Sequence, residues 1–279
     1  MTKLLRKLLE GKLSPEDIEQ VAGGFDAVGD LAVVKLPEEF PKDKKEKVSS
    51  ALLSEVKTVK AVWNQVGPVD GDFRIRKLEF LGGEPRSTTM YTEFGCRFLV
   101  DISKMYFSPR LSTERARIAD LVGGKEEIFN MFSGVGTYSI VIAKRHRSVV
   151  VYSSEINKDA YDYMVSNIEL NKVQGRVAPL LGDCAELWRK LVTGVDRVIM
   201  PLPERAKEYL QYAVKVCRPN ATIHYYAHVA TEDPRPFDLA WDEIKGDYPQ
   251  LSLQLGKVVR EVGPHVSQVV LDLKFAGRS

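Results

Sequence analysis

Two glycines and a carboxylate have the spacing of a nucleoside-binding site. Gly134 and Gly136 follow the apolar run at residues 128–132, and small residues there let the backbone turn tightly and let a ligand approach the main chain. Glu155 follows the next apolar run, at residues 148–152, about 20 residues after the glycines, where a βαβ unit often presents a carboxylate to ribose hydroxyls. The alternative is a turn with no ligand. The two glycines alone support this interpretation as well as they support a binding site.

The same stretch argues against a dinucleotide ligand. The fingerprint G-x-G-x-x-G needs a third glycine at the position where this chain has Ser139. The pattern therefore favours a nucleoside ligand without a pyrophosphate, and S-adenosylmethionine is the common ligand of that kind.

Composition and length describe a globular protein of two domains. The chain has 279 residues, of which 44% are hydrophobic and 28% charged, and its net charge of +2 does not by itself indicate a nucleic-acid partner. No apolar run approaches the length of a membrane span, and the N-terminus has no apolar signal segment. Cys96, Cys184 and Cys217 form no CxxC motif. We therefore expect a cytoplasmic protein in a reducing compartment, with no membrane segment and no metal site.

The first part of the chain predicts a smaller N-terminal α+β domain, residues 1–105. Ser14 followed by Pro15 is a helix-start signal. Residues 74–80 and 87–94 alternate as two strands, with a Gly-Gly-Glu-Pro turn between them at 82–85. The other expected elements are helices at 4–13 and 44–56 and strands at 25–36, 59–63 and 97–102.

From Tyr106 onward, strands alternate with helices. This alternation predicts an α/β fold with a parallel doubly wound sheet, and the strongly alternating strand at 266–275 suits an edge hairpin with residues 255–259. The pattern fits a Rossmann-like class I methyltransferase domain, residues 106–279. The other expected strands are 128–132, 148–152, 176–181, 196–200 and 221–227, and the helices are 110–121, 138–144, 160–170, 185–191 and 206–217.

Ligands of such sheets bind at the carboxyl ends of the strands. Besides the glycines and Glu155, the residues at such ends are Asp183, Cys184, Pro201 and Pro203. In a methyltransferase Glu155 would bind the ribose hydroxyls and Asp183 would accept a hydrogen bond from the adenine amino group. The prolines would shape the floor under the methyl acceptor. Asp183 also suits the N-cap of the next helix, and both roles are compatible.

Arg110 and Glu114 are four residues apart and would share one helix face. An isolated pair at this spacing is most often a surface salt bridge that contributes little to stability. Here the helix leads directly into the glycine stretch, which favours a functional role.

Several runs of the chain resemble the archaeal and eukaryotic tRNA (guanine37-N1)-methyltransferases. They are MYFSPRLSTERARIADLV, the glycine stretch, SSEIN, GDCAE and DRVIMPLP in the second domain, and FDAVGDLAVVKL and GDFRIRKLEFLGGE in the first. The PRLxxER run is fairly specific, whereas the two glycines are not. The resemblance implies an enzyme that transfers the methyl group of S-adenosylmethionine to N1 of guanosine-37, with the tRNA anticodon loop as its partner. We expect a monomer.

The resemblance also implies roles for individual residues. Guanine N1 carries a proton at neutral pH, so its methylation needs a general base and a group that offsets negative charge on O6. By resemblance Glu114 is the base and Arg74 stabilises O6, while Tyr106 and Arg110 hold the guanine and nearby backbone. The implied cofactor-binding positions are Arg115, Phe132, Gly134, Gly136, Glu155, Ile156, Asp183, Cys184, Pro201 and Pro203.

The chain departs from the family pattern at two positions and at its start. The motif after the fourth strand is usually Asn-x-Pro, with the Asn side chain hydrogen-bonding the target base, but this chain has Pro201 there and keeps Pro203. Asn130 stands where Asp is common. Because the chain begins with what resembles the family's middle domain, we expect a form that lacks the extra N-terminal domain.

Two other functions agree with the same features. One is the related wybutosine-pathway enzyme, which transfers the aminocarboxypropyl group of S-adenosylmethionine to tRNA, although its run after Phe-Ser-Pro usually lacks the Arg and Glu found here. The other is a non-catalytic tRNA-binding relative, which the proline at position 201 favours.

Overall fold

The chain divides into two compact units. The computed structural model describes residues 4–67, 75–191 and 194–277. The units are Met1–Arg110 and Leu111–Ser279, so the division falls a few residues after the boundary at 105–106 expected from the sequence. Each unit has an apolar core of its own.

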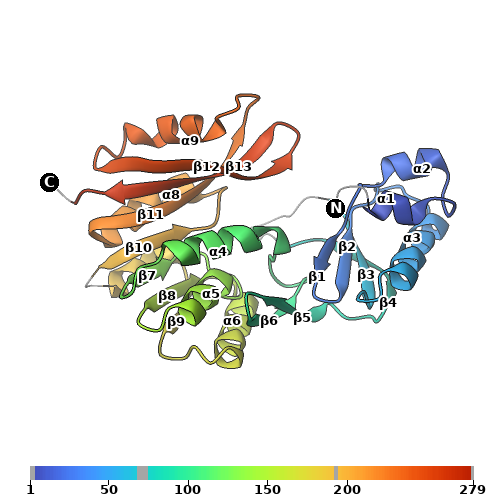
Figure 1. The fold of residues 1–279 in the computed structure, drawn as a ribbon, viewed down its shortest axis with the longest axis horizontal. Coiled ribbons are helices and arrows are strands. Elements are labelled where there is room, and N and C mark those ends of the chain that lie inside the picture. Colours follow the sequence, from blue (N-terminus) through green and yellow to red (C-terminus); the bar gives the residue numbers. More distant parts are fainter. Residues whose placement is uncertain (1–3, 68–74, 192–193, 278–279) are drawn as a thin grey trace. The chain divides into compact units, whose positions relative to one another are not determined.

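The first unit contains a four-stranded sheet in the order β1-β2-β3-β4 (Figure 1). Strands β2 and β3 pair in parallel, whereas the β1–β2 and β3–β4 pairs are antiparallel. Leu5, Leu9 and Leu52 from the helices are fully buried in the core of this unit. The strands are β1 Asp26–Val28, β2 Leu31–Val34, β3 Ala61–Gln65 and β4 Leu78–Gly83, and the helices are α1 Leu4–Leu9, α2 Pro15–Gln20 and α3 Lys42–Glu55.

The helix start predicted from Ser14 and Pro15 is confirmed. Pro15 is the first residue of α2, and Ser14 Oγ accepts a hydrogen bond from the Asp17 backbone N–H at 3.3 Å. This cap satisfies one of the N–H groups that a helix start leaves without an intrahelical partner.

The predicted hairpin turn at residues 82–85 is wrong, because Gly82 and Gly83 are the last two residues of β4 and pair with β3. Strand β4 pairs with β3, while β5 (Thr88–Glu93) pairs with β6 (Cys96–Asp101) in a separate two-stranded sheet. Gly83 has a φ of +89°, and a Cβ there would lie 2.2 Å from the Lys60 carbonyl oxygen. This glycine therefore permits the close approach of β4 to the segment that enters β3.

The second unit is built on a seven-stranded sheet in the order β12-β13-β11-β10-β7-β8-β9 (Figure 1). Strands β7 to β11 are parallel, and β13 runs antiparallel to both β11 and β12. A parallel sheet with a terminal antiparallel hairpin confirms the predicted class I methyltransferase fold. The strands are β7 Glu127–Asn130, β8 Val150–Glu155, β9 Val177–Leu181, β10 Val195–Met200, β11 Cys217–Ala230, β12 Leu251–Gly263 and β13 Val266–Phe275.

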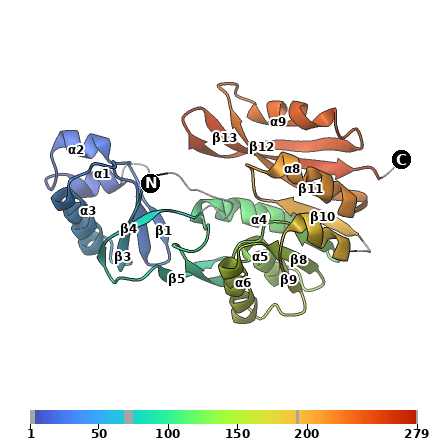
Figure 2. The same cartoon turned by 180° about the vertical axis from the view of Figure 1, so that it is seen from behind.

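Helices cover this sheet on both faces. Figure 1 shows α4 beside α5, and Figure 2 shows α8 beside β10 and β11. Helix α9, which packs against β12 and β13, was missed by the sequence analysis, although its apolar residues have helical spacing. The helices are α4 Ser112–Leu121, α5 Thr137–Arg145, α6 Lys158–Leu170, α7 Cys184–Leu187, α8 Ala206–Val216 and α9 Pro236–Lys245.

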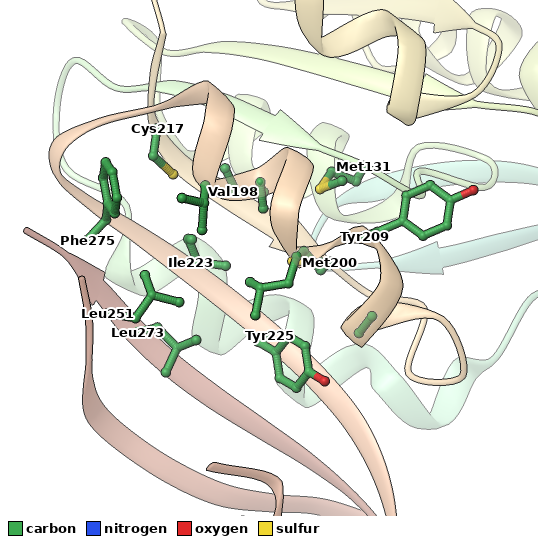
Figure 3. Close-up of a cluster of buried hydrophobic side chains, with 14 of the residues drawn as sticks. Met131, Val198, Met200, Tyr209, Cys217, Ile223, Tyr225, Leu251, Leu273 and Phe275 are labelled. Carbon is green, nitrogen blue, oxygen red and sulfur yellow. The ribbon is translucent and has the colours of Figure 1, made fainter. Parts of the chain in front are cut away.

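Alternate residues of β11 and β13 point to opposite faces of the sheet. Ile223 and Tyr225 belong to the apolar core cluster with residues of α8 and α9 (Figure 3). His224, Tyr226 and Asp272 are buried polar residues, and the last two bond to side chains of α4. The alternation predicted for the last strand is therefore present, but β13 lies inside the sheet and β12 forms the edge.

Candidate functional site

The glycine stretch joins β7 to α5. Gly134 and Gly136 have φ values of +53° and +85°, in the left-handed region that favours glycine. A Cβ on Gly136 would lie 3.0 Å from Met164 Cγ and 3.1 Å from Ile140 Cδ1. The Gly136 N–H donates to the Ser133 carbonyl oxygen at 2.9 Å. Gly136 is therefore required both by the backbone conformation and by close packing.

Glu155, the last residue of β8, is bonded to this glycine turn. Its Oε2 accepts a hydrogen bond from the Gly134 N–H at 2.6 Å, and its Oε1 accepts one from the Asn157 N–H at 2.9 Å. Burial raises the pKa of the Glu155 carboxyl, and backbone hydrogen bonds from Asn157, Gly134 and Ile156 partly offset this effect. A carboxylate has about four acceptor sites, so Glu155 can accept a further hydrogen bond. The structure thus brings Glu155 and the first glycine together, while the neighbouring Ile156 is exposed.

Asp183 is the N-cap of α7. Its Oδ1 accepts a hydrogen bond from the Ala185 N–H at 2.8 Å, and its Oδ2 accepts one from the Tyr209 hydroxyl at 3.2 Å. The Tyr209 ring meets the Phe132 ring edge to face, with centroids 5.1 Å apart. Burial raises the pKa of the adjacent Cys184 thiol, which is therefore neutral near pH 7. Tyr209 on α8 therefore links Asp183, which follows β9, to Phe132, which follows β7.

Glu114 and Arg115 on α4 are buried, with 4% and 2% of their surfaces exposed. Glu114 Oε1 accepts hydrogen bonds from the Tyr226 hydroxyl at 2.7 Å and from Arg117 Nη2 at 2.8 Å, and Oε2 accepts one from Arg117 Nε at 2.9 Å. The Tyr138 hydroxyl, in the first turn of α5, donates to the Tyr226 hydroxyl at 3.5 Å. The Glu114 carboxylate therefore connects through Tyr226 to the start of the helix that follows the glycine turn.

Arg110 and Glu114 do not share a helix face, so that prediction is wrong. Helix α4 begins at Ser112, and Arg110 lies in the preceding 3-10 turn, Pro109–Leu111. Arg110 Nε instead donates to Asp26 Oδ1 at 2.7 Å within the first unit. The prediction assumed one continuous α-helix, in which residues four apart lie on the same face. Arg110 is in a 3-10 turn, which has three residues per turn, so this spacing does not apply to it.

The remaining predicted residues belong to different parts of the chain. Pro201 and Pro203 follow β10, the first half-buried and the second buried. Tyr106 is half-buried in the first unit, and Arg74 lies outside the described residues.

Asn130, where the resemblance leads one to expect Asp, is fully buried at the end of β7. Its Nδ2 donates a hydrogen bond to Ser139 Oγ at 3.1 Å, and Ser139 Oγ also accepts one from Ser153 Oγ at 2.7 Å. A neutral amide is easier to bury than a carboxylate, although the Asn130 Oδ1 has no hydrogen-bond partner among the described residues.

Tyr209, Arg117 and Tyr226 were not predicted from the sequence as site residues. Arg117 lies three residues after Glu114, and this spacing is a recognisable signal for a helical ion pair. Tyr226 is 112 residues from Glu114 in sequence, so no local pattern links the two. Only the fold brings them together.

A cavity of about 520 Å³ lies at the amino-terminal ends of β10 and β11 in the second unit, opposite the carboxyl ends that carry the predicted site residues. Trp188, Lys215 and Phe275 are among its lining residues. None of the predicted site residues lines this cavity.

Two protein families together match most of the chain. The family described as TRM5/TYW2 methyltransferase domain matches residues 89–244, and the family described as TYW2 N-terminal domain matches residues 5–87. The chain belongs to the TRM5/TYW2 methyltransferase family. This membership confirms the predicted family, the predicted enzyme class and S-adenosylmethionine as the cofactor.

Three relatives are similar over most of the chain. The tRNA 4-demethylwyosine(37)-methyltransferase Taw21 of Saccharolobus solfataricus is 36% identical over 93% of this chain and 96% of its own length. The tRNA (guanine(37)-N(1))-methyltransferase Trm5b of Pyrococcus abyssi is 36% identical over 90% of this chain and 74% of its own. The tRNA(Phe) (4-demethylwyosine(37)-C(7)) aminocarboxypropyltransferase of Methanocaldococcus jannaschii is 30% identical over 90% of this chain and 97% of its own.

Two solved structures have the same fold. The complex of aTrm5 and tRNALeu matches with a TM-score of 0.87 and 31% identity, covering 97% of this chain and 78% of that one. The M. jannaschii TYW2 structure in complex with AdoMet matches with a TM-score of 0.66 and 25% identity, covering 91% of this chain and 100% of that one.

Within residues 4–67, 75–191 and 194–277, no helix is long and apolar enough to cross a membrane. Over the same ranges, no group of three or more His, Cys, Asp and Glu side chains is arranged to hold a metal ion. Cys96, Cys184 and Cys217 are buried, and none of them forms a disulfide bond.

Gly136→Ala is expected to lower the free energy of unfolding of the second unit by about 1–3 kcal/mol, because alanine rarely adopts this φ and its Cβ would press on Met164 and Ile140. Urea denaturation followed by circular dichroism measures the change. Gly246→Ala is the control, since nothing lies within 4 Å of its Cβ position. Equal midpoints for the two variants would contradict the prediction.

Proposed function

We propose that this protein transfers the methyl group of S-adenosylmethionine to N1 of guanosine-37 in the anticodon loop of tRNA. The observation that carries the proposal is the buried Glu114 carboxylate, which Tyr226 connects to the helix that follows the glycine turn. The likeness to Trm5b and to the aTrm5 complex with tRNALeu supports tRNA as the substrate and partner.

Residues at the carboxyl ends of three neighbouring strands fit the cofactor. Glu155 can accept hydrogen bonds from ribose hydroxyls while keeping its two backbone donors. The glycine turn admits a ligand close to the main chain, and the Phe132–Tyr209 pair next to Asp183 suits a purine. S-adenosylmethionine supplies a methyl group on a positively charged sulfur, which keeps the bonding electron pair after transfer. The other residues proposed for this site are Arg115, Gly136, Ile156, Cys184, Pro201 and Pro203.

The chain's own residues handle the proton and the developing charge. Guanine N1 loses its proton as the new bond to carbon forms, and Glu114 is the proposed acceptor. Arg74 is proposed to offset the negative charge on O6. Tyr106 and Arg110 are proposed to hold the guanine and neighbouring backbone, which is the contribution assigned to the first unit. Methyl transfer then requires mainly that these groups be well positioned.

Incubation of the full chain with S-adenosylmethionine and a tRNA carrying guanosine at position 37 tests the proposal. Nucleoside mass spectrometry should detect 1-methylguanosine, and label on the methyl carbon should enter the tRNA. Transfer of label from the carboxyl carbon instead would indicate the activity named for the M. jannaschii aminocarboxypropyl relative. Cofactor and tRNA binding without transfer of either label would identify a non-catalytic relative.

Glu114→Gln is expected to lower the single-turnover rate of methyl transfer by about 10²–10⁴-fold, because the amide cannot accept the proton. Affinity for S-adenosylmethionine, measured by calorimetry, should stay the same. Glu243→Gln, the same change at an exposed ion pair with Lys207, is the control. A rate equal to that of the control would remove Glu114 from the role.

A second acceptor, 4-demethylwyosine at position 37, is favoured by one residue. Pro201 stands where the guanosine-specific pattern has an asparagine that bonds to the target base, and proline has no side-chain donor. The likeness to Taw21, named as a 4-demethylwyosine methyltransferase, agrees with an altered acceptor. The position is half-buried directly after β10, at the edge of the sheet where the proposed cofactor residues lie.

Pro201→Asn is expected to shift acceptor preference toward guanosine. The restored hydrogen bond should raise kcat/KM for the guanosine tRNA by about two- to tenfold, which corresponds to the usual net free energy of one hydrogen bond. Parallel assays with tRNAs that carry guanosine or 4-demethylwyosine at position 37 measure the ratio. An unchanged ratio, with methylation intact, would separate Pro201 from acceptor choice.

A further inference from the structure

Glu114 is the first member of a chain of buried polar side chains. Arg117 donates to both of its oxygens, and Tyr226 donates to Oε1. The same guanidinium also donates from Nη1 to Asp272 Oδ2 at 2.6 Å and from Nη2 to Asp272 Oδ1 at 3.1 Å. One arginine therefore bridges two carboxylates, one on α4 and one on β13.

Asp272 is held in turn by His224. The His224 Nδ1 lies 2.6 Å from Asp272 Oδ1, and its Nε2 lies 2.7 Å from Arg197 Nη1. Because arginine can only donate, Nε2 must be the acceptor, which assigns the ring hydrogen to Nδ1 and makes His224 a donor to Asp272. Complete burial lowers the pKa of His224, in agreement with a neutral ring. Arg197 is itself paired with Glu126.

The sheet geometry explains why these residues meet. His224 and Tyr226 are two residues apart on β11, so their side chains point to the same face. His224 is directly opposite Asp272 on β13. Arg117 lies three residues after Glu114 on α4, and both side chains reach that face. The Glu114 carboxylate on α4 is therefore bonded directly to β11 through Tyr226 and indirectly to β13 through Arg117.

We propose that Arg117 and Asp272 are positioning residues that fix the Glu114 carboxylate and set how readily it takes a proton, with His224 holding Asp272 in place. The inference rests on the proposed function, since it takes Glu114 as the acceptor of the proton from the substrate. The proton moves from the substrate nitrogen to a Glu114 oxygen, and Arg117 remains charged throughout.

The charges of Arg117 and Asp272 act on the Glu114 carboxylate in opposite directions. Arg117 places a positive charge against the carboxylate and so favours its ionised form. Asp272 shares that charge and adds a negative one nearby, so it favours protonation of Glu114. Burial raises the pKa of Tyr226 and of Tyr138, and these phenols therefore stay protonated as fixed donors in a neutral-pH assay. The charged and titratable groups that contact Glu114 are Arg117 on α4 and Tyr226 on β11. Behind them lie Tyr138 on α5, Asp272 on β13, His224 on β11 and Arg197 on β10, and Arg115 is the next residue along α4.

The test is the pH dependence of single-turnover methyl transfer to the tRNA that the wild type uses. Arg117→Gln should move the acidic limb of the profile to higher pH by about one unit or more, since the carboxylate loses its neighbouring cation. Asp272→Asn should move the same limb to lower pH, because Arg117 then acts on Glu114 alone. Opposite shifts support the proposal. Lower rates with unmoved limbs, or shifts in the same direction, would overturn it in favour of a purely structural role.

The matched controls come from an exposed ion pair of α4 and α5. Asp120→Asn and Arg145→Gln repeat the two chemical changes at a pair that is outside the buried chain, and their profiles should match that of the wild type. Calorimetric titration with S-adenosylmethionine and far-UV circular dichroism confirm that each variant is folded. Tyr226→Phe removes one donor from Glu114 and no charge, so it provides the decisive profile if a charge variant does not fold.

Tyr226→Phe should move the acidic limb to higher pH by less than Arg117→Gln does, and an unmoved limb would overturn the proposal. The outcome is distinct from failure of the proposed function. A wild type that methylates neither tRNA would refute that function, whereas an active wild type whose variants show no opposite shifts refutes only the role of Arg117 and Asp272.

Discussion

The guanidinium of Arg117 is the constraint on which the placement of α4 depends. It bonds to Glu114 on its own helix and to Asp272 on β13, so it ties the helix to the sheet where both carboxylates are buried. Charged groups are stable in such places only when they are paired and hydrogen-bonded. Loss of one partner would leave a buried charge uncompensated, which typically costs about 3–5 kcal/mol. The position of Glu114 is therefore a property of helix and sheet together.

A second carboxylate, that of Glu155 at the carboxyl end of β8, is held in place without any contribution from Arg117. Glu155 is held by the Gly134 and Asn157 N–H groups, and its geometry depends on a turn that needs Gly136. In both places the protein supplies donors that orient the carboxylate before any ligand arrives. Groups oriented in advance need little rearrangement during a reaction, which is the main way in which proteins stabilise developing charge.

The sequence predicted what depends on local spacing. The strands, the helix start at Ser14 and the approach of Glu155 to the glycine turn follow from periodicity and from the βαβ pattern. The bonds from Arg117 to Asp272 and from Tyr226 to Glu114 join residues 155 and 112 positions apart, so they have no local signal. The strand expected at 87–94 is close to β5, but the one expected at 74–80 is placed too early, since β4 is Leu78–Gly83. The pairing of these two strands was not predictable from local spacing, because each pairs with another strand.

In this proposal, the residue that accepts the proton and the residue that selects the base to be methylated lie on different elements of the fold. Any neutral base that gains a methyl group must lose a proton to remain neutral, so the group of α4, β11 and β13 residues around Glu114 serves guanine and a modified guanine alike. Discrimination between such bases comes from hydrogen bonds to their edges, because a site built to bond one edge leaves polar groups unpaired with another. Pro201 follows β10 and presents no side-chain donor. One element can therefore change the substrate while the other preserves the chemistry.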